Sequence, residues 1–183
     1  LEDYVSMRTL YNGETLDYFT AYARIQKQWE KEDRSPLLTL SASDSERGWK
    51  VLQNFGIPKE AWFVCVHVRE SGYKKENPNF YISTRNADIN TYLLAFQSVV
   101  DRGGWVIRMG DSTMKRLPSI DRVIDYAHSQ FKSDWMDVFL WAKCKFFIGT
   151  PSGPCSVPPT FGVPCVLTNY PQGFPLPFSK DIF

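Results

Sequence analysis

The chain of 183 residues has few of the side chains that build metal centres. It holds only two histidines, His67 and His128, and four cysteines, none of them in a CxxC pair. Zinc sites need several such ligands at close spacing, so we expect no metal site. Cys65 and Cys144 lie inside apolar runs, where a thiol usually acts as a small hydrophobic side chain. We therefore expect all four cysteines to be reduced and structural.

The sequence also lacks a charge excess and a long apolar run. Its 21 basic and 20 acidic side chains give a formal net charge of +1, too little to hold a nucleic-acid backbone nonspecifically. No apolar run approaches the roughly 20 residues that cross a bilayer, and the first residues lack the pattern of a leader peptide. We expect a cytoplasmic protein with no transmembrane segment and no nucleic-acid partner.

Two familiar phosphate-binding motifs are missing. There is no glycine-rich loop ending in lysine and no three-glycine dinucleotide fingerprint. The first expected strand leads instead into the polar segment RESGY at residues 69–73. This absence disfavours an oxidoreductase or a methyltransferase of the Rossmann type.

What is present is an alternation of helical and strand-like segments. Residues 1–34 have helical character, with an amphipathic helix at 16–32, and Pro36 ends it. The remaining segments predict helices at 43–55, 87–102, 132–144 and 156–162, and strands at 62–68, 105–110, 123–129, 145–150 and 164–169. Ser43 is the expected cap of the first of these helices. This order predicts an α/β fold with a parallel sheet and helices on both faces.

The same pattern divides the chain into two parts. We expect a helix and linker at residues 1–42, which form the joint to a further N-terminal domain or partner chain. Residues 43–183 are expected to form one Rossmann-like domain, because 43% hydrophobic content over this length supports a single core.

Polar side chains follow four of the expected strands. Because the carboxyl ends of parallel strands meet at one edge of a sheet, we expect these clusters to converge there. They are His67, Arg69 and Glu70; Arg108, Gly110 and Asp111; Tyr126, His128 and Ser129; and Gly149, Thr150, Ser152 and Gly153.

The cluster after the first strand suits a phosphate or diphosphate. His67 and Arg69 are two residues apart and point to the same side of an extended strand. A guanidinium fork matches two phosphate oxygens. The alternative is a buried His67 bonded to a carbonyl and an Arg69 paired with Glu70.

Acidic side chains have two interpretations each. Asp111 suits a ribose or a base edge, or it caps the segment that follows. Asp134 and Asp137 stand one helical turn apart near a helix start, where negative charge is favoured. We expect Asp134 to cap this helix and Asp137 to contact a ligand.

The segment GTPSGP at residues 149–154 consists of small residues and prolines. Small residues let a backbone approach a ligand, and a short helix starting near Ser156 would direct N–H groups toward it. Pro158 and Pro159 fit the first turn of such a helix. Taken alone, the segment is more typical of a plain turn between a strand and a helix.

Together the segments VHVRE, GDSTM, SDWMD and FIGTPSGPCSVPPTFGVP resemble a family of bacterial glycosyltransferases encoded in surface-polysaccharide gene clusters. More distantly, they are similar to the nucleotide-sugar-binding half of fucosyltransferases with an HVRxxD motif. The resemblance covers residues 40–183. It implies the C-terminal, donor-binding half of a GT-B-type enzyme that uses a nucleotide-diphosphate sugar and a glycan acceptor without a metal or other cofactor.

The resemblance also implies roles for particular residues. Arg69 would contact the donor phosphate, with Thr150, Ser152 and Gly153 on the phosphate-binding turn. Nucleoside contacts would come from Asp111 and Asp137, and we add His128 to this group. Glu70 stands where the fucosyltransferases usually have a second basic residue, which argues against GDP-fucose as the donor.

Inverting sugar transfer needs a base for the acceptor hydroxyl. Glu70 and His67 are the candidates here, and a second domain is an alternative source. The sequence therefore predicts a glycosyltransferase, with a noncatalytic nucleotide- or glycan-binding module of the same fold as the alternative.

Overall fold

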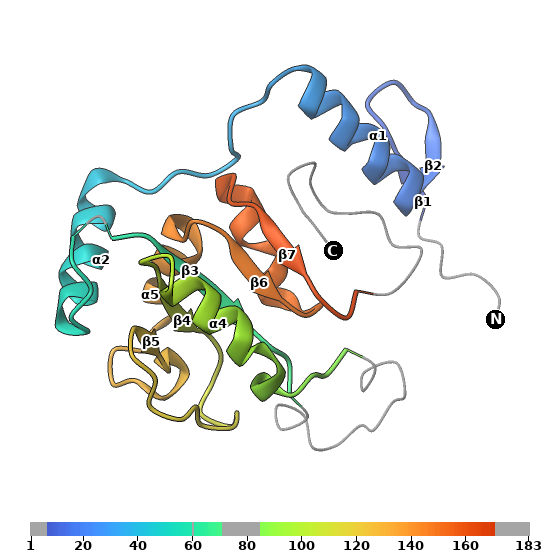
Figure 1. Cartoon of the computed structure of the whole chain (residues 1–183). Coiled ribbons are helices and arrows are strands. Elements are labelled where there is room, and N and C mark those ends of the chain that lie inside the picture. Colours follow the sequence, from blue (N-terminus) through green and yellow to red (C-terminus); the bar gives the residue numbers. More distant parts are fainter. Residues whose placement is uncertain (1–6, 60, 71–84, 171–183) are drawn as a thin grey trace.

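The computed structural model describes residues 7–59, 61–70 and 85–170. Within them lies a five-stranded sheet in which every neighbouring pair of strands is parallel (Figure 1). Its order is β5-β4-β3-β6-β7. The strands are β3 (Phe63–His67), β4 (Trp105–Arg108), β5 (Val123–Ile124), β6 (Phe147–Gly149) and β7 (Cys165–Leu167). The predicted α/β class with a parallel sheet is confirmed.

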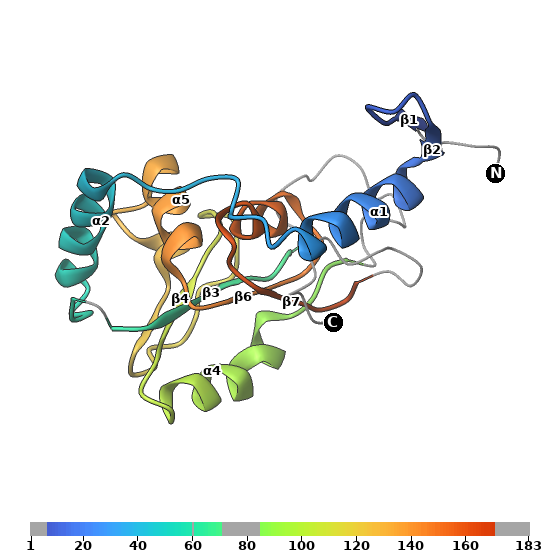
Figure 2. The same cartoon turned by 90° about the horizontal axis from the view of Figure 1, so that it is seen from above.

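Helices cover both faces of the sheet, as predicted (Figure 2). On one face lie α2 (Ala42–Asn54) and α5 (Asp134–Lys143), with the short 3-10 helices η4 (Gly153–Ser156) and η5 (Pro158–Phe161) beside them. On the other lies α4 (Leu93–Val100), preceded by η2 (Ile89–Tyr92). None of the helices in the described ranges is long and apolar enough to cross a membrane.

Alternation along β3 builds the two halves of the core. Phe63 and Cys65 point to the α2 and α5 side, whereas Val64 and Val66 point to the α4 side. All four side chains are fully or almost fully buried. A strand covered on both faces has no polar face, which explains the continuous apolar run in the sequence.

The two helices on one face approach closely through a glycine. Gly48 of α2 is buried, and a Cβ built there would lie 2.2 Å from the ring of Phe139 in α5. Trp49 packs edge-on against the same ring, with centroids 6.1 Å apart. Glycine at position 48 is therefore required by the packing of α2 on α5.

Two expected helix caps are displaced. Ser41, rather than Ser43, accepts a hydrogen bond from the backbone N–H of Asp44 at 3.0 Å and caps α2. Ser133, rather than Asp134, accepts from the N–H of Met136 at 3.2 Å and caps α5. In both places a serine in extended conformation just before the helix provides the better capping geometry.

The expected strand 123–129 is shorter than predicted. It ends at Ile124, and the 3-10 helix η3 (Tyr126–His128) follows. Asp125 turns the chain there, because its carboxylate accepts hydrogen bonds from Arg108 at 2.8 Å and from the N–H of Leu117 at 3.1 Å. Likewise, the expected helix 156–162 is the shorter 3-10 helix η5. A second 3-10 helix, η4, precedes it, and each has a proline in its first turn.

The helical character expected throughout residues 1–34 is wrong for the first part of that range. A hairpin of β1 (Met7–Thr9) and β2 (Thr15–Asp17) precedes α1 (Tyr18–Lys31). Residues 10–13 form its turn, in which the N–H of Gly13 donates to the carbonyl of Leu10 at 2.9 Å and Gly13 has a φ of 84°. Asn-Gly is a strong hairpin signal, and it explains why the chain does not start a helix here.

The linker between α1 and α2 is attached to the main body of the domain. The N–H of Leu38 donates to the carbonyl of Thr160 in η5 at 2.9 Å. A Cβ built on Gly162 would lie 2.7 Å from the ring of Pro36, so the proline packs directly on that glycine. From this attachment the chain runs to α1 and the hairpin, which extend to one side of the sheet (Figure 2). The predicted division of the chain at residue 42 stays a prediction.

Candidate functional site

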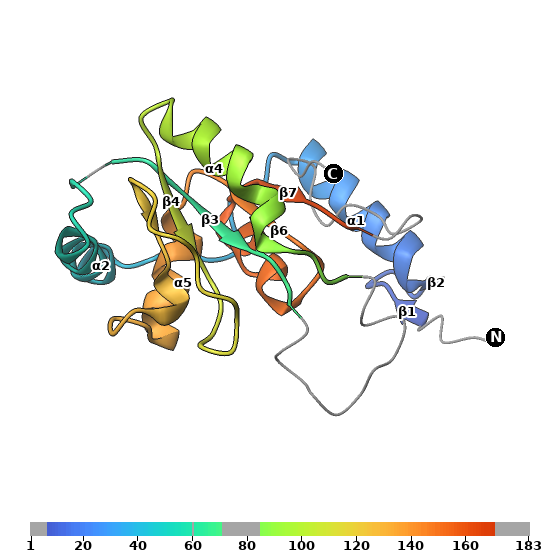
Figure 3. The ribbon, with the colours of Figure 1, turned by 60° about the horizontal axis from the view of Figure 1, so that its bottom comes forward.

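The order of the strands contains one reversal. β3 is the first strand of the sheet in the chain, yet it lies between the second, β4, and the fourth, β6. Figure 3 shows β3 and β6 side by side. In open α/β sheets of this kind the chain leaves the two central strands in opposite directions, and a crevice opens at their carboxyl ends. The loops after β3 and β6 are therefore the first place to look for a site.

A hydrogen-bond network joins these two loops. The N–H of Thr150 donates to the carbonyl of His67 at 3.2 Å, and the N–H of Arg69 donates to the Thr150 hydroxyl at 2.9 Å. The Ser152 hydroxyl lies 3.2 Å from Nδ1 of His67. The structure thus brings together four predicted site residues, two from each loop.

The same network orients the ring of His67. Because the Ser152 hydroxyl donates to the Thr150 carbonyl at 3.1 Å, it can accept from a protonated Nδ1 of the imidazole. Burial, reinforced by the positive charge of Arg108, lowers the pKa of His67 from 6.5 to about 4. The ring is therefore neutral at neutral pH.

Glu70 does not pair with Arg69. One of its carboxylate oxygens lies 3.2 Å from the guanidinium of Arg108, and the other accepts from the N–H of Lys115 at 2.6 Å. Arg69 is partly buried and forms no ion pair with any described acidic side chain. Burial and the positive charge of Arg85 lower its pKa. Its guanidinium is thus available for an anion from outside the described chain.

Arg108 has a structural task instead. It is fully buried, bonded to Glu70, and held by Asp125 at 2.8 Å and by the carbonyl of Lys115 at 2.9 Å. A buried guanidinium requires such partners, because an uncompensated charge in the core is costly. Arg108 therefore holds the loop after β4 in place. Its positive charge is paired with the negative charge of Glu70, which is then not available to Arg69.

Asp111 lies after β4, close enough to His67 for each of the two side chains to affect the pKa of the other. One carboxylate oxygen accepts from the N–H and the hydroxyl of Thr113, at 2.8 and 2.5 Å. Burial alone would raise the pKa of Asp111, but these hydrogen bonds and the neighbouring positive groups lower it. The local turn that we considered as an alternative is present, and it occupies only one of the two carboxylate oxygens.

His128 and Asp137 belong to a separate cluster around η3 and the start of α5. Nε2 of His128 lies 3.0 Å from the carbonyl of Met114, and its side chain is almost fully buried. Asp137 forms an ion pair with Lys132 at 2.5 Å, and its other oxygen is buried without a hydrogen-bond partner. No described hydrogen bond joins this cluster to Arg69 or Thr150, so the ligand roles of both residues stay predictions.

Gly153 differs from Gly149 in the space around it. A Cβ on Gly149 would lie 2.5 Å from the Phe147 ring and 3.0 Å from the His67 carbonyl, so glycine is required there by packing. A Cβ on Gly153 would meet no atom within 4 Å. The turn at Ser152 and Gly153 therefore borders open space.

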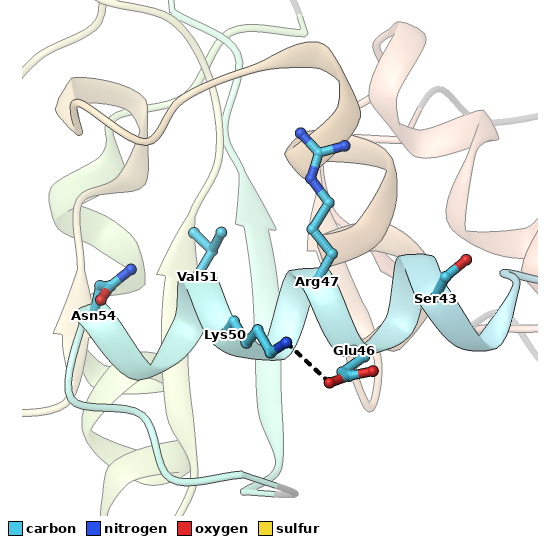
Figure 4. Close-up of a pocket in the computed structure, with 6 residues that line it drawn as sticks. All are labelled: Ser43, Glu46, Arg47, Lys50, Val51 and Asn54. Carbon is cyan, nitrogen blue, oxygen red and sulfur yellow. Dashed lines mark ion pairs between the residues drawn. The ribbon is translucent and has the colours of Figure 1, made fainter.

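A surface depression of about 340 Å³ lies elsewhere, along α2 (Figure 4). It is lined by Ser43, Glu46, Arg47, Lys50, Val51 and Asn54, and it includes the exposed ion pair between Lys50 and Glu46 at 2.9 Å. None of the predicted site residues borders it. Among the described residues, no group of three or more His, Cys, Asp and Glu side chains could hold a metal ion. All four cysteines are buried thiols that form no disulfide bond.

Two solved structures have a fold similar to that of this chain. The chain resembles the glycosyl transferase family 9 protein from Veillonella parvula DSM 2008, with a TM-score of 0.55 and 13% identity over 79% of this chain and 41% of that one. It also resembles the E. coli ADP-heptose lps heptosyltransferase II, with a TM-score of 0.53 and 15% identity over 79% of this chain and 43% of that one. No protein-family model and no curated protein matches the sequence.

At this identity the likeness establishes the fold. The predicted α/β fold with its parallel sheet matches part of both of these glycosyltransferase structures. The chain spans about four tenths of the length of the structures it matches. The expected likeness to fucosyltransferases stays a prediction.

Proposed function

We propose that this chain is the donor-binding half of a glycosyltransferase. It binds a nucleotide-diphosphate sugar and serves sugar transfer to a glycan acceptor in the biosynthesis of a bacterial surface polysaccharide. The observation that carries this proposal is the network of His67, Arg69, Thr150 and Ser152 at the reversal of strand order. A GT-B-like fold with polar loops at that position suits a nucleotide.

The chemistry requires stabilisation of a leaving group. As the sugar departs, negative charge builds up on the diphosphate, and preorganised donors lower the energy of that state. Arg69 supplies a guanidinium without a described counter-ion. The N–H groups of Ser152 and Gly153 donate to no described acceptor and border open space. These groups support transfer without a metal ion.

Nucleoside recognition falls to the loop after β4 and to the cluster at the start of α5. The unoccupied carboxylate oxygen of Asp111 suits a ribose hydroxyl. Asp137 and His128 are the further candidates, on the side of β5. Since one matched structure is an ADP-heptose heptosyltransferase, adenine nucleotides belong among the donors to be tested.

The proton acceptor for the glycan hydroxyl comes from outside this half. Both oxygens of Glu70 already accept hydrogen bonds. With a pKa of about 4, His67 accepts a proton only weakly near pH 7. The chain covers 41% of one matched enzyme, so a second domain that carries the acceptor and the base completes the proposed cleft.

The same observation favours a second candidate function, a noncatalytic module that binds the nucleotide sugar without turnover. Release of free nucleoside diphosphate from a nucleotide sugar by the full-length protein separates the two. A glycosyltransferase releases it in the presence of acceptor, whereas a binding module does not.

Isothermal titration against UDP-, GDP-, ADP- and CMP-sugars tests the binding site. We expect at least one nucleotide-diphosphate sugar to bind, with affinity reduced at least about tenfold in Arg69→Gln because a charge-assisted hydrogen bond is lost. Binding should persist in EDTA. Arg102→Gln, the same change in an exposed arginine before β4, is the matched control. Absence of binding by every donor, or equal affinity of Arg69→Gln and the native chain, contradicts the proposal.

A further inference from the structure

The segment 85–87 lies against Arg69, although sequence reasoning did not single it out. The N–H of Ala87 donates to the carbonyl of Arg69 at 3.0 Å. On its other side, the Asn169 side chain after β7 donates to the carbonyl of Asn86 at 3.2 Å. Arg85, two residues before Ala87, therefore stands at the carboxyl edge of the sheet beside Arg69.

Neither guanidinium has an acidic partner within residues 7–59, 61–70 and 85–170. Arg69 and Arg85 are both partly buried. The nearest acidic residues in sequence are otherwise engaged, because Glu70 bonds to Arg108 and Asp88 lies 3.7 Å from Lys115. In contrast, Arg108 has two carboxylates around it. The fold thus neutralises the buried arginine and leaves two positive charges together at the edge.

Two neighbouring guanidiniums without a counter-ion repel each other. Burial and the charge of Arg85 both disfavour the charged form of Arg69, as the lowered pKa of Arg69 reflects. An anion placed between them removes this repulsion. A guanidinium offers its donors in a flat fork that matches the oxygens of one phosphoryl group.

We propose that Arg69 and Arg85 form a two-arginine clamp that binds the two phosphoryl groups of a diphosphate and selects it over a monophosphate. The clamp deepens the proposed function and rests on it, and it adds Arg85 as a binding residue. Each arginine holds one phosphoryl group, and the turn at Ser152 and Gly153 provides N–H donors beside Arg69. Nucleoside diphosphates and their sugars are thus the ligand class, whereas CMP-sugars engage only one arginine.

Titration of the full chain with inorganic pyrophosphate and with inorganic phosphate tests the clamp without any nucleoside. The native chain should bind pyrophosphate at least about tenfold more tightly than phosphate, since two charge-assisted contacts replace one. Arg85→Gln should weaken pyrophosphate binding at least about tenfold and change phosphate binding less than about threefold. Arg85→Lys should restore part of the loss, because it retains the charge but not the fork.

Arg102→Gln is again the matched control, and thermal unfolding of each variant checks that it is folded. The clamp is overturned if Arg85→Gln binds pyrophosphate as the native chain does, or if the native chain does not prefer pyrophosphate. A native chain that binds pyrophosphate through Arg85 but no nucleotide sugar retains the clamp and contradicts the proposed function. A chain that binds nucleotide sugars through Arg69 but not through Arg85 supports the proposed function and contradicts the clamp.

Discussion

His67 is a titratable side chain held in its neutral form. Its imidazole is buried at the end of β3, and the positive charge of Arg108 opposes its protonation. In the unfolded chain the ring titrates near 6.5, and in the folded chain near 4. Between these values the unfolded chain binds more protons, so acid favours unfolding in that window.

We therefore expect the free energy of unfolding to fall by about 3 kcal/mol as the pH drops from about 6.5 to about 4, beyond what other groups contribute. His67→Gln keeps a polar side chain at this position but removes the titration. Urea unfolding of both proteins at several pH values measures the difference in their free energies of unfolding. The contributions of the carboxylates, which both proteins share, largely cancel in this difference. Parallel stability curves for the two proteins would refute this account of His67.

Sequence reasoning found half of the clamp because Arg69 follows a strand directly. His67, Thr150 and Ser152 were predictable for the same reason, since strand ends meet at one edge. Arg85 was not, because it lies in a polar loop and its significance depends on the engagement of Glu70 by Arg108. Which acid neutralises which arginine is decided by three-dimensional proximity, and neighbours in the sequence do not reveal it.

At the scale of elements, the contact between α2 and α5 depends on one missing side chain. Gly48 allows the ring of Phe139 to lie against the backbone of α2. Trp135 stacks on the same ring, with centroids 6.0 Å apart. The ring is thus held on several sides and has little room to move.

We expect Gly48→Ala to destabilise the chain by about 1–2 kcal/mol. Alanine improves helix propensity by up to about 1 kcal/mol, but overpacking against Phe139 costs about 1–3 kcal/mol. Denaturant unfolding measures the change, with exposed Lys50→Ala in the same helix as the control. Adding Phe139→Leu to Gly48→Ala should recover part of the loss. A stabilised Gly48→Ala would mean that the two helices separate easily.

The prediction of elements succeeded where periodicity is long and failed where a single side chain turns the chain. The helices at 42–54 and 134–143 follow from apolar spacing, although the predicted caps, Ser43 and Asp134, are not the residues that cap them. The end of β5 at Ile124 does not, because Asp125 turns the chain in response to Arg108, which is distant in sequence. The hairpin before α1 was missed although the dipeptide Asn12-Gly13, a common hairpin signal, is present in the sequence.

At the scale of the whole molecule, the parallel sheet was predictable and its strand order was not. Alternating strands and helices imply parallel pairing, but the chain carries no local signal for which strands become neighbours. The order β5-β4-β3-β6-β7 places the reversal between β3 and β6. Only this order shows that two of the four predicted clusters lie at the centre of the sheet while the others lie toward one side.

The attachment of Pro36 and Leu38 to η5 also determines where a protease can separate the molecule. Lys31 and Arg34 are exposed and lie between α1 and this attachment, so trypsin can cut after either without disturbing Gly162 or Thr160. N-terminal sequencing of the resistant material should find chains that start at Glu32 or Ser35. A start inside α2 would show that the attachment is weak. Chains that start at Glu32 or Ser35 would retain the linker that joins Pro36 and Leu38 to η5, without the hairpin and α1.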